Sequence, residues 1–229
     1  MQPRSIQAFL TDTAQKDTAT GPFELENNRL LEVKLTGRVW AKVGSMVAYI
    51  GAVKFTREGL LERGMGTLLK KAVSGEGAQL MKMEGQGRVY LADQGKRVQL
   101  LALGDETIVV NGNDLLALED RVQWSITMMR SLGGMLAAGL FNVRVTGPGL
   151  VAITTHHQPL TLAVRVKYPV YTDPNATVAW SGDLEPTVAT DVSLGTLLGR
   201  GSGESVQLKF AGTGWVVVQP NEERTFQRR

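Results

Sequence analysis

From residue 30 onward, apolar and polar residues alternate along short stretches of the chain. In residues 31–35 and 206–210 every second residue is apolar. This period of two is typical of a strand with one buried face, because successive side chains of a strand point to opposite sides of the sheet. Glycine-rich breaks between such runs predict turns. The pattern therefore predicts many short strands and almost no helix.

The two ends of the chain differ from this middle part. Residues 1–28 are polar and rich in Thr, Gln and Asp, and we expect an irregular arm there with a short strand at residues 6–10. Residues 221–229 contain several arginines and are expected to form a solvated basic tail. We expect residues 29–220 to form a single all-β domain.

Two sequence motifs recur along this domain. Gly-x-Gly turns at residues 85–87, 147–149 and 212–214 each lead into an apolar, β-prone run. Recurrence at intervals of roughly 60 residues indicates internal repeats. A second motif, a strand, a tight turn and another strand, aligns three further segments, which are residues 39–49, 108–118 and 170–180. The two motifs together place three degenerate repeats at residues 29–92, 97–153 and 159–218.

The repeats predict the fold class. Each would contain about six short strands in three linked hairpins, which favours an all-β sandwich or prism. A solenoid is disfavoured, because about 60 residues is long for one coil. The motif-bound aromatic residues Trp40, Tyr49, Trp180 and Trp215 are expected to pack in the core or in an interface rather than form a ligand cage.

Several motifs resemble a known family. They are segment 44–51, the Gly-Glu-Gly motif at 75–77, the Gly-x-Gly turns at 85 and 147, and the ending 214–220. Their number, order and spacing resemble the mitochondrial biogenesis family named for altered inheritance of mitochondria, formerly a domain of unknown function and common in bacteria. The resemblance runs from about residue 30 to residue 220. It implies a fold like that of the tryptophan RNA-binding attenuation protein, which is a double-stranded β-helix-like sandwich, in a homo-oligomer. It implies no catalytic residues; the mitochondrial members are associated with inner-membrane organisation, and the bacterial members have no settled activity.

Charge and cysteine content narrow the function classes. The chain has 25 basic and 22 acidic residues, with no clustered basic face and no aromatic-plus-basic platform, so a nucleic-acid partner is not expected. It has no cysteine, which excludes disulfides, thiol catalysis and cysteine metal sites and suits the cytoplasm. We find no secretion signal pattern and no apolar run near the ~20 residues of a membrane-spanning helix.

Catalytic motifs are not legible either. His156 and His157 are expected to form a polar turn before Pro159, and the acidic residues Glu76, Glu84, Asp93 and Glu119 are scattered and expected to be solvated. No serine stands in a Gly-x-Ser-x-Gly elbow. The glycine-rich loop at 199–203 lacks the Gly-Lys-Ser/Thr ending of a phosphate loop. We therefore expect no enzyme, no cofactor and no metal site.

One repeated element suggests a surface. Glycine- and leucine-rich segments at residues 64–71, 132–137 and 194–200 precede the later hairpin of each repeat. Because loops usually lie on the surface and are polar, apolar loops predict either burial in a core or subunit interface, or a partner. The three segments would emerge at related places only if the repeats formed a closed ring, because a linear stack would separate them. The candidate surface residues for a membrane or protein partner are Met65, Leu68, Leu69, Lys70, Lys71, Arg130, Leu132, Met135, Leu136, Leu197, Leu198 and Arg200.

Three function classes remain. The first is a non-enzymatic scaffold or interaction protein, cytoplasmic and homo-oligomeric, with peripheral contact to a membrane or protein. Unpaired sheet edges and the symmetry of identical chains favour an oligomer, and we expect a trimer. The alternative is a small-molecule binding module with a pocket between the sheets or at a subunit seam. The third is an enzyme of unrecognised type, which a cluster of ionisable residues in one cleft would favour.

Overall fold

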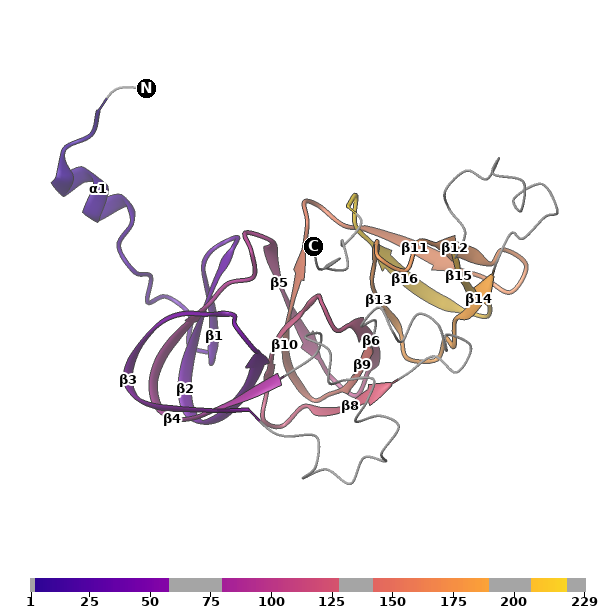
Figure 1. Ribbon diagram of the computed structural model, residues 1–229, viewed down its shortest axis with the longest axis horizontal. Coiled ribbons are helices and arrows are strands. Elements are labelled where there is room, and N and C mark those ends of the chain that lie inside the picture. Colours follow the sequence, from indigo (N-terminus) through magenta and orange to yellow (C-terminus); the bar gives the residue numbers. More distant parts are fainter. Residues whose placement is uncertain (1–2, 58–79, 128–141, 190–206, 222–229) are drawn as a thin grey trace, which may run out of the picture.

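The computed structural model describes residues 3–57, 80–127, 142–189 and 207–221 (Figure 1). These residues form one short helix and sixteen strands, and every strand pairing is antiparallel. The all-β class predicted from the alternating pattern is thus confirmed.

The N-terminal arm contains the helix, α1 (Ile6–Asp12). The prediction of a strand at residues 6–10 was wrong, because these residues are helical. The Ser5 side chain accepts a hydrogen bond from the backbone N–H of Ala8 and caps the helix, an interaction of about 1 kcal/mol. The arm also contains strand β1 (Phe23–Asn27), which pairs with the next strand, so the sheet begins within the segment expected to be irregular.

Three structural units follow, of which units 2 and 3 have the six strands expected of each repeat and unit 1 has three. Unit 1 (residues 30–91) has three long strands, which are β2 (Leu30–Lys42), β3 (Met46–Arg57) and β4 (Leu80–Leu91). Unit 2 (residues 97–155) has six, which are β5 (Arg97–Leu103), β6 (Thr107–Asn111), β7 (Leu115–Glu119), β8 (Gln123–Thr127), β9 (Asn142–Thr146) and β10 (Gly149–Thr155). Unit 3 (residues 160–218) also has six, which are β11 (Leu160–Val164), β12 (Val170–Thr172), β13 (Thr177–Ser181), β14 (Thr187–Ala189), β15 (Gln207–Phe210) and β16 (Gly214–Val218).

Units 2 and 3 share one pairing scheme. The sixth strand pairs with the first and third strands, as β10 does with β5 and β7 and β16 does with β11 and β13. The fifth strand pairs with the second and fourth, as β9 does with β6 and β8 and β15 does with β12 and β14. In unit 1, the single strand β4 serves as both the fifth and the sixth strand, since it pairs with β2 over residues 80–91 and with β3 over residues 81–91. Each long strand of unit 1 thus takes the place of two short ones.

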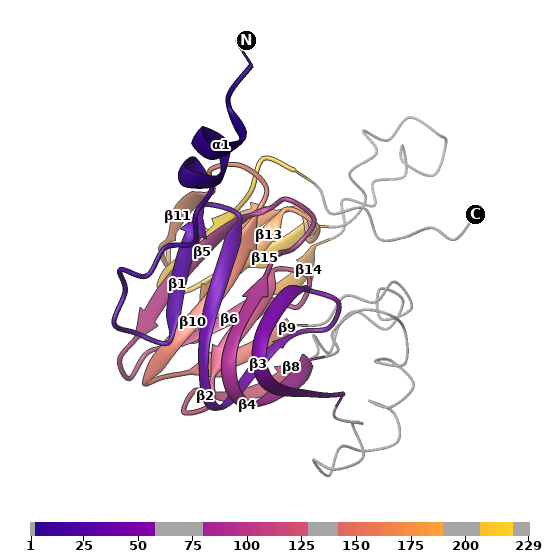
Figure 2. The ribbon, with the colours of Figure 1, turned by 90° about the vertical axis from the view of Figure 1, so that its left-hand side faces the viewer.

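The long strands of unit 1 must fold back on themselves. Lys42, the last residue of β2, lies opposite Leu80 at the start of β4, whereas Met46 at the start of β3 lies opposite Leu91 at the end of β4. Residues 43–45 are too few to span the length of β4, so its two ends must lie close together. Figures 1 and 2 show these three strands strongly curved.

Glycines allow this bend. Gly37 on β2 lies opposite Gly85 on β4, and Gly51 on β3 lies opposite Gly87 on β4. Gly85 has φ of +128°, a conformation that side-chain-bearing residues rarely adopt, and a Cβ atom there would overlap the carbonyl oxygen of Ala52. The Gly-x-Gly turns found in the sequence are therefore the points at which the chain passes from one layer of a unit to the other.

The units join edge to edge in an open row. The second strand of one unit pairs with the third strand of the next, so that Trp40 on β2 lies opposite Leu118 on β7, and Val109 on β6 lies opposite Trp180 on β13. Within the described residues, the outer strands β3 and β12 do not pair with each other. The units therefore form a row rather than a closed ring (Figure 1).

Three apolar clusters fill the units, and neighbouring units share them. The cluster of unit 1 includes Leu116 from unit 2, and the cluster of unit 2 includes Trp40 from unit 1 and Val178 from unit 3. The cluster of unit 3 includes Val109 from unit 2. Each join thus buries apolar side chains that one isolated unit would expose.

Candidate interaction surfaces

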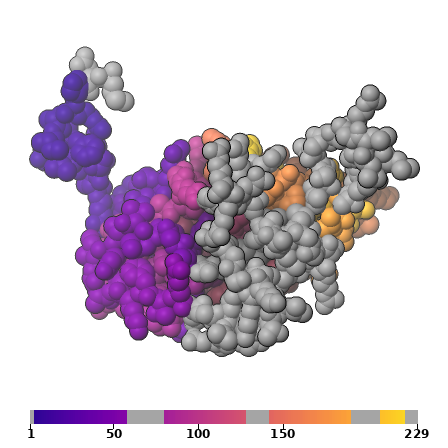
Figure 3. All heavy atoms as spheres, in the orientation of Figure 1, coloured from indigo at the N-terminus to yellow at the C-terminus, as the bar shows by residue number. Residues whose placement is uncertain are grey.

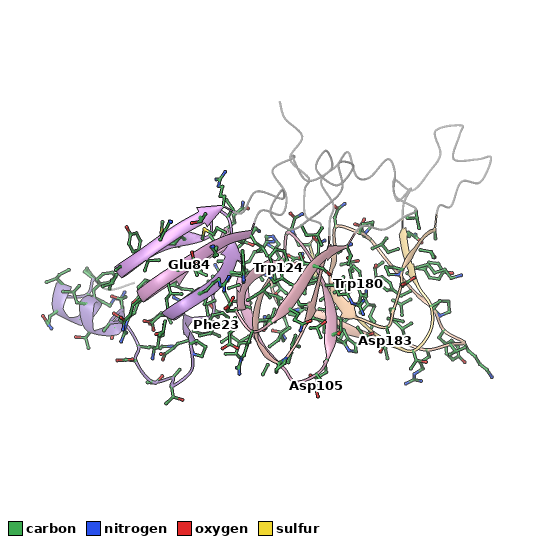
Figure 4. All side chains as sticks on the ribbon, turned by 90° about the horizontal axis from the view of Figure 1, so that it is seen from below. Phe23, Glu84, Asp105, Trp124, Trp180 and Asp183 are labelled. Atoms are coloured by element: carbon green, nitrogen blue, oxygen red, sulfur yellow. The ribbon has the colours of Figure 1, made fainter. Side chains whose placement is uncertain are left out.

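The three Gly/Leu segments belong to equivalent hairpins. Arg57 lies opposite Met81 where β3 meets β4, Thr127 lies opposite Asn142 where β8 meets β9, and Ala189 on β14 lies opposite Gln207 on β15. Residues 58–79, 128–141 and 190–206 connect these strand pairs. In Figure 4 the three pairs of strand ends lie along one side of the row. The expectation that a linear arrangement would separate these places was wrong, because each unit of the row repeats the same hairpin on the same side.

The twelve candidate surface residues all lie outside the described residues. They are Met65, Leu68, Leu69, Lys70 and Lys71 in the first connection, Arg130, Leu132, Met135 and Leu136 in the second, and Leu197, Leu198 and Arg200 in the third. The described strands fix only the points at which each connection leaves and re-enters its unit.

Exposed apolar side chains gather at the two ends of the row. At the unit 1 end, the first half of β3 exposes Met46, Val47, Tyr49 and Ile50. Tyr49 contacts Phe55 edge to face, with ring centroids 5.3 Å apart. Because monomeric proteins rarely expose a contiguous group of large apolar side chains, this edge is a candidate contact surface.

The unit 3 end has a similar group. Val166 and Tyr168 lie in the turn between β11 and β12 and are exposed, as is Tyr171 on β12. The Nζ atom of Lys209 lies 5.9 Å from the centre of the Tyr171 ring, a cation–π distance. Neither end could be identified from the sequence, because exposure depends on which strand is outermost.

Of the aromatic residues in the repeated motifs, some lie in the interior and one lies on the surface. Trp40 and Trp180 are buried, as predicted, and Trp215 is half-buried against the unit 2 cluster. Trp40 also contacts the ring of Trp124 edge to face at 5.3 Å. Tyr49 does not pack in the core of the chain but lies on its surface, and its packing in an interface stays a prediction.

Helix α1 is a third apolar surface. Ile6, Phe9 and Leu10 stand one turn apart on its face and are exposed, and none of its residues is buried. The helix projects from the body of the molecule (Figure 3). The Arg4 guanidinium lies 5.6 Å from the centre of the Phe9 ring, a cation–π distance.

A polar network holds the arm against unit 1. The Glu24 carboxylate accepts hydrogen bonds from the Thr18 N–H and hydroxyl and from the Ala19 N–H, at 2.7–3.1 Å. Lys34 lies 3.0 Å from Glu24 and 2.9 Å from Asp17. Hydrogen bonds from Thr18, with smaller contributions from Lys34 and Ala19, lower the pKa of Glu24 to about 2. The carboxylate thus stays charged and the arm stays attached under ordinary conditions.

A buried ion network joins units 1 and 2. Lys96 Nζ lies 3.0 Å from Asp114 Oδ1 and 3.6 Å from Asp93 Oδ2, and Lys42 Nζ lies 2.9 Å from the same Asp93 oxygen. The Thr154 hydroxyl donates a hydrogen bond to it. Burial raises the pKa of Asp93, but the Lys42 and Lys96 ammonium groups outweigh it and hold the pKa below its ordinary value.

This network corrects one expectation from the sequence, since Asp93 is buried rather than solvated. Its two aspartates are matched by two lysines, and its residues come from the ends of strands in two units. Charge-balanced buried pairs are typical of structural links, because each charge compensates the desolvation of the other. The network therefore links the two units.

The described residues can also be compared with the requirements of a metal site and of a membrane-spanning helix. His156 and His157 lie in the turn between β10 and β11. In the described ranges, no three His, Cys, Asp or Glu side chains are placed to hold a metal ion together. No helix in the described part of the chain is long and apolar enough to cross a membrane.

Comparisons with known proteins identify the family. The family model described as mitochondrial biogenesis AIM24 matches residues 23–221, and the chain belongs to this family. Solved structures similar to this chain include the crystal structure of protein SPYM3_0169 from Streptococcus pyogenes, with a TM-score of 0.67 and 23% sequence identity. The similarity covers 87% of this chain and 92% of the Streptococcus pyogenes chain. This likeness shows the fold alone. No curated protein matches the sequence. The expected likeness to the tryptophan RNA-binding attenuation protein stays a prediction.

Proposed function

We propose that this member of the AIM24 family is a non-enzymatic scaffold that binds an anionic membrane surface reversibly through its three Gly/Leu connections. The observation that carries the proposal is the repeated hairpin: each unit sends its connection out between two paired strands, and the strand ends lie along one side of the row (Figure 4). Because the described strand ends share one side, a flat surface facing that side would meet all three connections under this proposal.

The composition of the connections supports a membrane as the partner. Leucines and methionines stand beside the basic residues Lys70, Lys71, Arg130 and Arg200. Burying one leucine contributes about 1.5–3 kcal/mol, and one basic residue near an anionic leaflet contributes about 1 kcal/mol. Weak contacts that act together on one rigid body gain avidity, because the second and third contacts become intramolecular.

Two expectations from the sequence belong to the same proposal. A cytoplasmic location suits a chain without cysteine. Homo-oligomers would multiply the number of connections that meet the same membrane. The alternative of a ligand between the sheets is less favoured, because apolar side chains already fill the interiors of the described units.

Vesicle flotation tests the proposal with the full chain. We expect flotation with vesicles containing phosphatidylserine, and much less with vesicles of phosphatidylcholine alone. A variant with Leu68, Leu69, Leu136 and Leu197 changed to Ser should lose flotation while its thermal unfolding stays unchanged.

The matched control changes exposed apolar residues elsewhere, namely Ile6, Phe9 and Leu10 of α1, to Ser. This control should float like the unchanged chain. Loss of flotation in the control alone would move the membrane contact to the arm and overturn the proposal. Flotation that survives in the Leu-to-Ser variant, or that never occurs, also overturns it; the latter result would leave a protein partner for the connections.

A further inference from the structure

The two joins between units have the same register. Trp40 lies opposite Leu118 and Ala41 lies opposite Ala117 at the first join. At the second, Val109 lies opposite Trp180, and Val110 takes the place of Ala41 opposite Ala179. A join is therefore a defined, repeated interface between the second strand of one unit and the third strand of the next.

Pairing within the units shows which residue of unit 1 corresponds to Leu118 and Trp180, the third-strand residues of the two joins. Leu118 lies opposite Val151 on β10, and Trp180 lies opposite Val216 on β16. In unit 1, Tyr49 lies opposite Val89 on β4. All three strands also have a register shift at the same place, two or three residues earlier. The first half of β3 is thus the third strand of unit 1, but no described unit is paired with it in a join.

The second strand of unit 3 is the corresponding open edge at the other end. Val109 on β6 lies opposite Arg144 on β9, and Tyr171 on β12 lies opposite Lys209 on β15. Tyr171 therefore corresponds to Val109 of unit 2, and in the same way to Trp40 of unit 1, which lies opposite Lys82. No described unit follows β12 to cover this edge.

Burial shows that these two edges lack a partner among the residues that the structure describes. Tyr49 is 48% exposed, whereas its equivalents Leu118 and Trp180 are 0% and 3% exposed. Tyr171 is 49% exposed, whereas Trp40 and Val109 are 2% and 4% exposed.

Val47 on β3 shows the same contrast as Tyr49. It is 62% exposed, but its equivalents Leu116 and Val178 are fully buried, and each packs in the apolar cluster of the preceding unit. The first half of β3 thus carries the side chains that would fill a preceding unit.

We propose that the β12 edge of one copy of this chain pairs with the β3 edge of a second copy and continues the row of units from chain to chain. The repeated register places Tyr171 opposite Tyr49 of the second copy, Thr172 opposite Ala48 and Val170 opposite Ile50. The strands run antiparallel, as at both internal joins.

A second copy fits these edges because each edge matches the other. β12 is the second strand of its unit, and β3 provides the third strand of its unit. At both internal joins a second strand pairs with a third strand. Open strand edges carry unpaired N–H and C=O groups, which a neighbouring chain can satisfy. A contact between two different surfaces of identical chains closes into a ring or extends into a filament. A trimeric ring, the state expected from the sequence, would be one such closure. This inference does not rest on membrane binding.

Light scattering on the full chain tests the contact with three variants. Val47→Lys with Tyr49→Lys blocks the β3 edge, Tyr171→Lys blocks the β12 edge, and Leu160→Lys changes an exposed leucine on β11 as the matched control. All four positions are exposed, so the fold should be unchanged by circular dichroism. We expect the unchanged chain and the control to form oligomers, and each blocked variant alone to run as a single chain of 24.8 kDa.

Mixing the two blocked variants gives the decisive result. Each retains the edge that the other lacks, so an equimolar mixture should form a dimer of twice the single-chain mass. A blocked variant that still dimerises alone would show pairing between like edges and overturn the proposal. An unchanged chain that is monomeric, or a mixture that stays monomeric, overturns it as well, because the edges are then covered within the chain.

Cross-linking tests the register independently. The chain contains no cysteine, so introduced thiols have no competitors. Residues directly opposite in an antiparallel pair have Cβ atoms about 4.5–5.5 Å apart, near the range that a disulfide bridges. Oxidising a mixture of Tyr49→Cys and Tyr171→Cys chains should give a cross-linked dimer. Tyr49→Cys mixed with Leu160→Cys should give none, and equal yields in the two mixtures would overturn the register.

Discussion

Lys42 Nζ lies 2.9 Å from Asp93 Oδ2, although Lys42 pairs with the first residue of β4 and Asp93 follows the last. The contact ties together the two ends of a strand that folds back on itself. Asp93 also contacts Lys96, and Lys42 Nζ donates a hydrogen bond to the carbonyl oxygen of Asn113 in unit 2. One ion network therefore holds both the fold of unit 1 and its join to unit 2.

Breaking this network on one side should be strongly destabilising. We expect Asp114→Ala to lower the free energy of unfolding by about 3–5 kcal/mol, because the ammonium group of Lys96 would stay buried without its nearest carboxylate. Urea unfolding measures the change. Asp12→Ala, which removes the exposed Arg4–Asp12 pair, is the matched control and should cost less than about 1 kcal/mol. Equal effects of the two changes would show that the buried network does not link the units.

The bend at Gly85 should not tolerate a side chain. We expect Gly85→Ala to destabilise the protein by more than about 1 kcal/mol, because a positive φ and the nearby carbonyl oxygen of Ala52 both disfavour a Cβ atom. Gly21→Ala is the control: a Cβ atom there meets nothing within 4 Å, and its stability should change by less than about 0.5 kcal/mol. A neutral Gly85→Ala in chemical denaturation would mean that the bend does not depend on glycine.

Acid should release the N-terminal arm. The pKa of Glu24 is lowered from 4.5 to about 2, so its charge stabilises the folded arm above pH 4.5, and this contribution disappears as the pH falls from about 4.5 to about 2. The NMR amide signals of Thr18 and Ala19 should shift over this interval toward unfolded positions. In a Glu24→Gln variant they should already be shifted at neutral pH and stay constant in acid. Signals that titrate identically in both proteins would exclude Glu24 as the attachment point.

Equivalent positions in different units should respond differently to truncation. Trp40→Ala should cost about 3–5 kcal/mol, because Trp40 fills the unit 2 cluster at the first join. Tyr171→Ala should change the stability of the single chain by less than about 0.5 kcal/mol, since its ring is half exposed. Denaturation at low protein concentration separates this effect from assembly. A large cost for Tyr171→Ala under these conditions would show that the β12 edge is already packed within the chain.

Local patterns predicted much of the fold. The period-two alternation predicted strands, and the Gly-x-Gly motifs located the turns at Gly149 and Gly212 and the bend within β4 at Gly85, each with a positive φ. Such features depend on residues next to one another in the chain, and sequence reasoning captures them well.

The prediction of a strand at residues 6–10 was wrong, because Ser5 caps a helix there. A run of five residues is too short to distinguish a strand from a helix by its pattern alone.

The sequence by itself determined the all-β class, the three repeats and their turns, because alternation and glycine placement act over a few residues. Only the tertiary structure decided that Asp93 is buried in an ion network, that Tyr49 is exposed while its equivalents Leu118 and Trp180 are buried, and that the row leaves β3 and β12 open. These outcomes depend on which unit lies beside which. The same motif becomes interior where a neighbouring unit covers it and surface where the row ends.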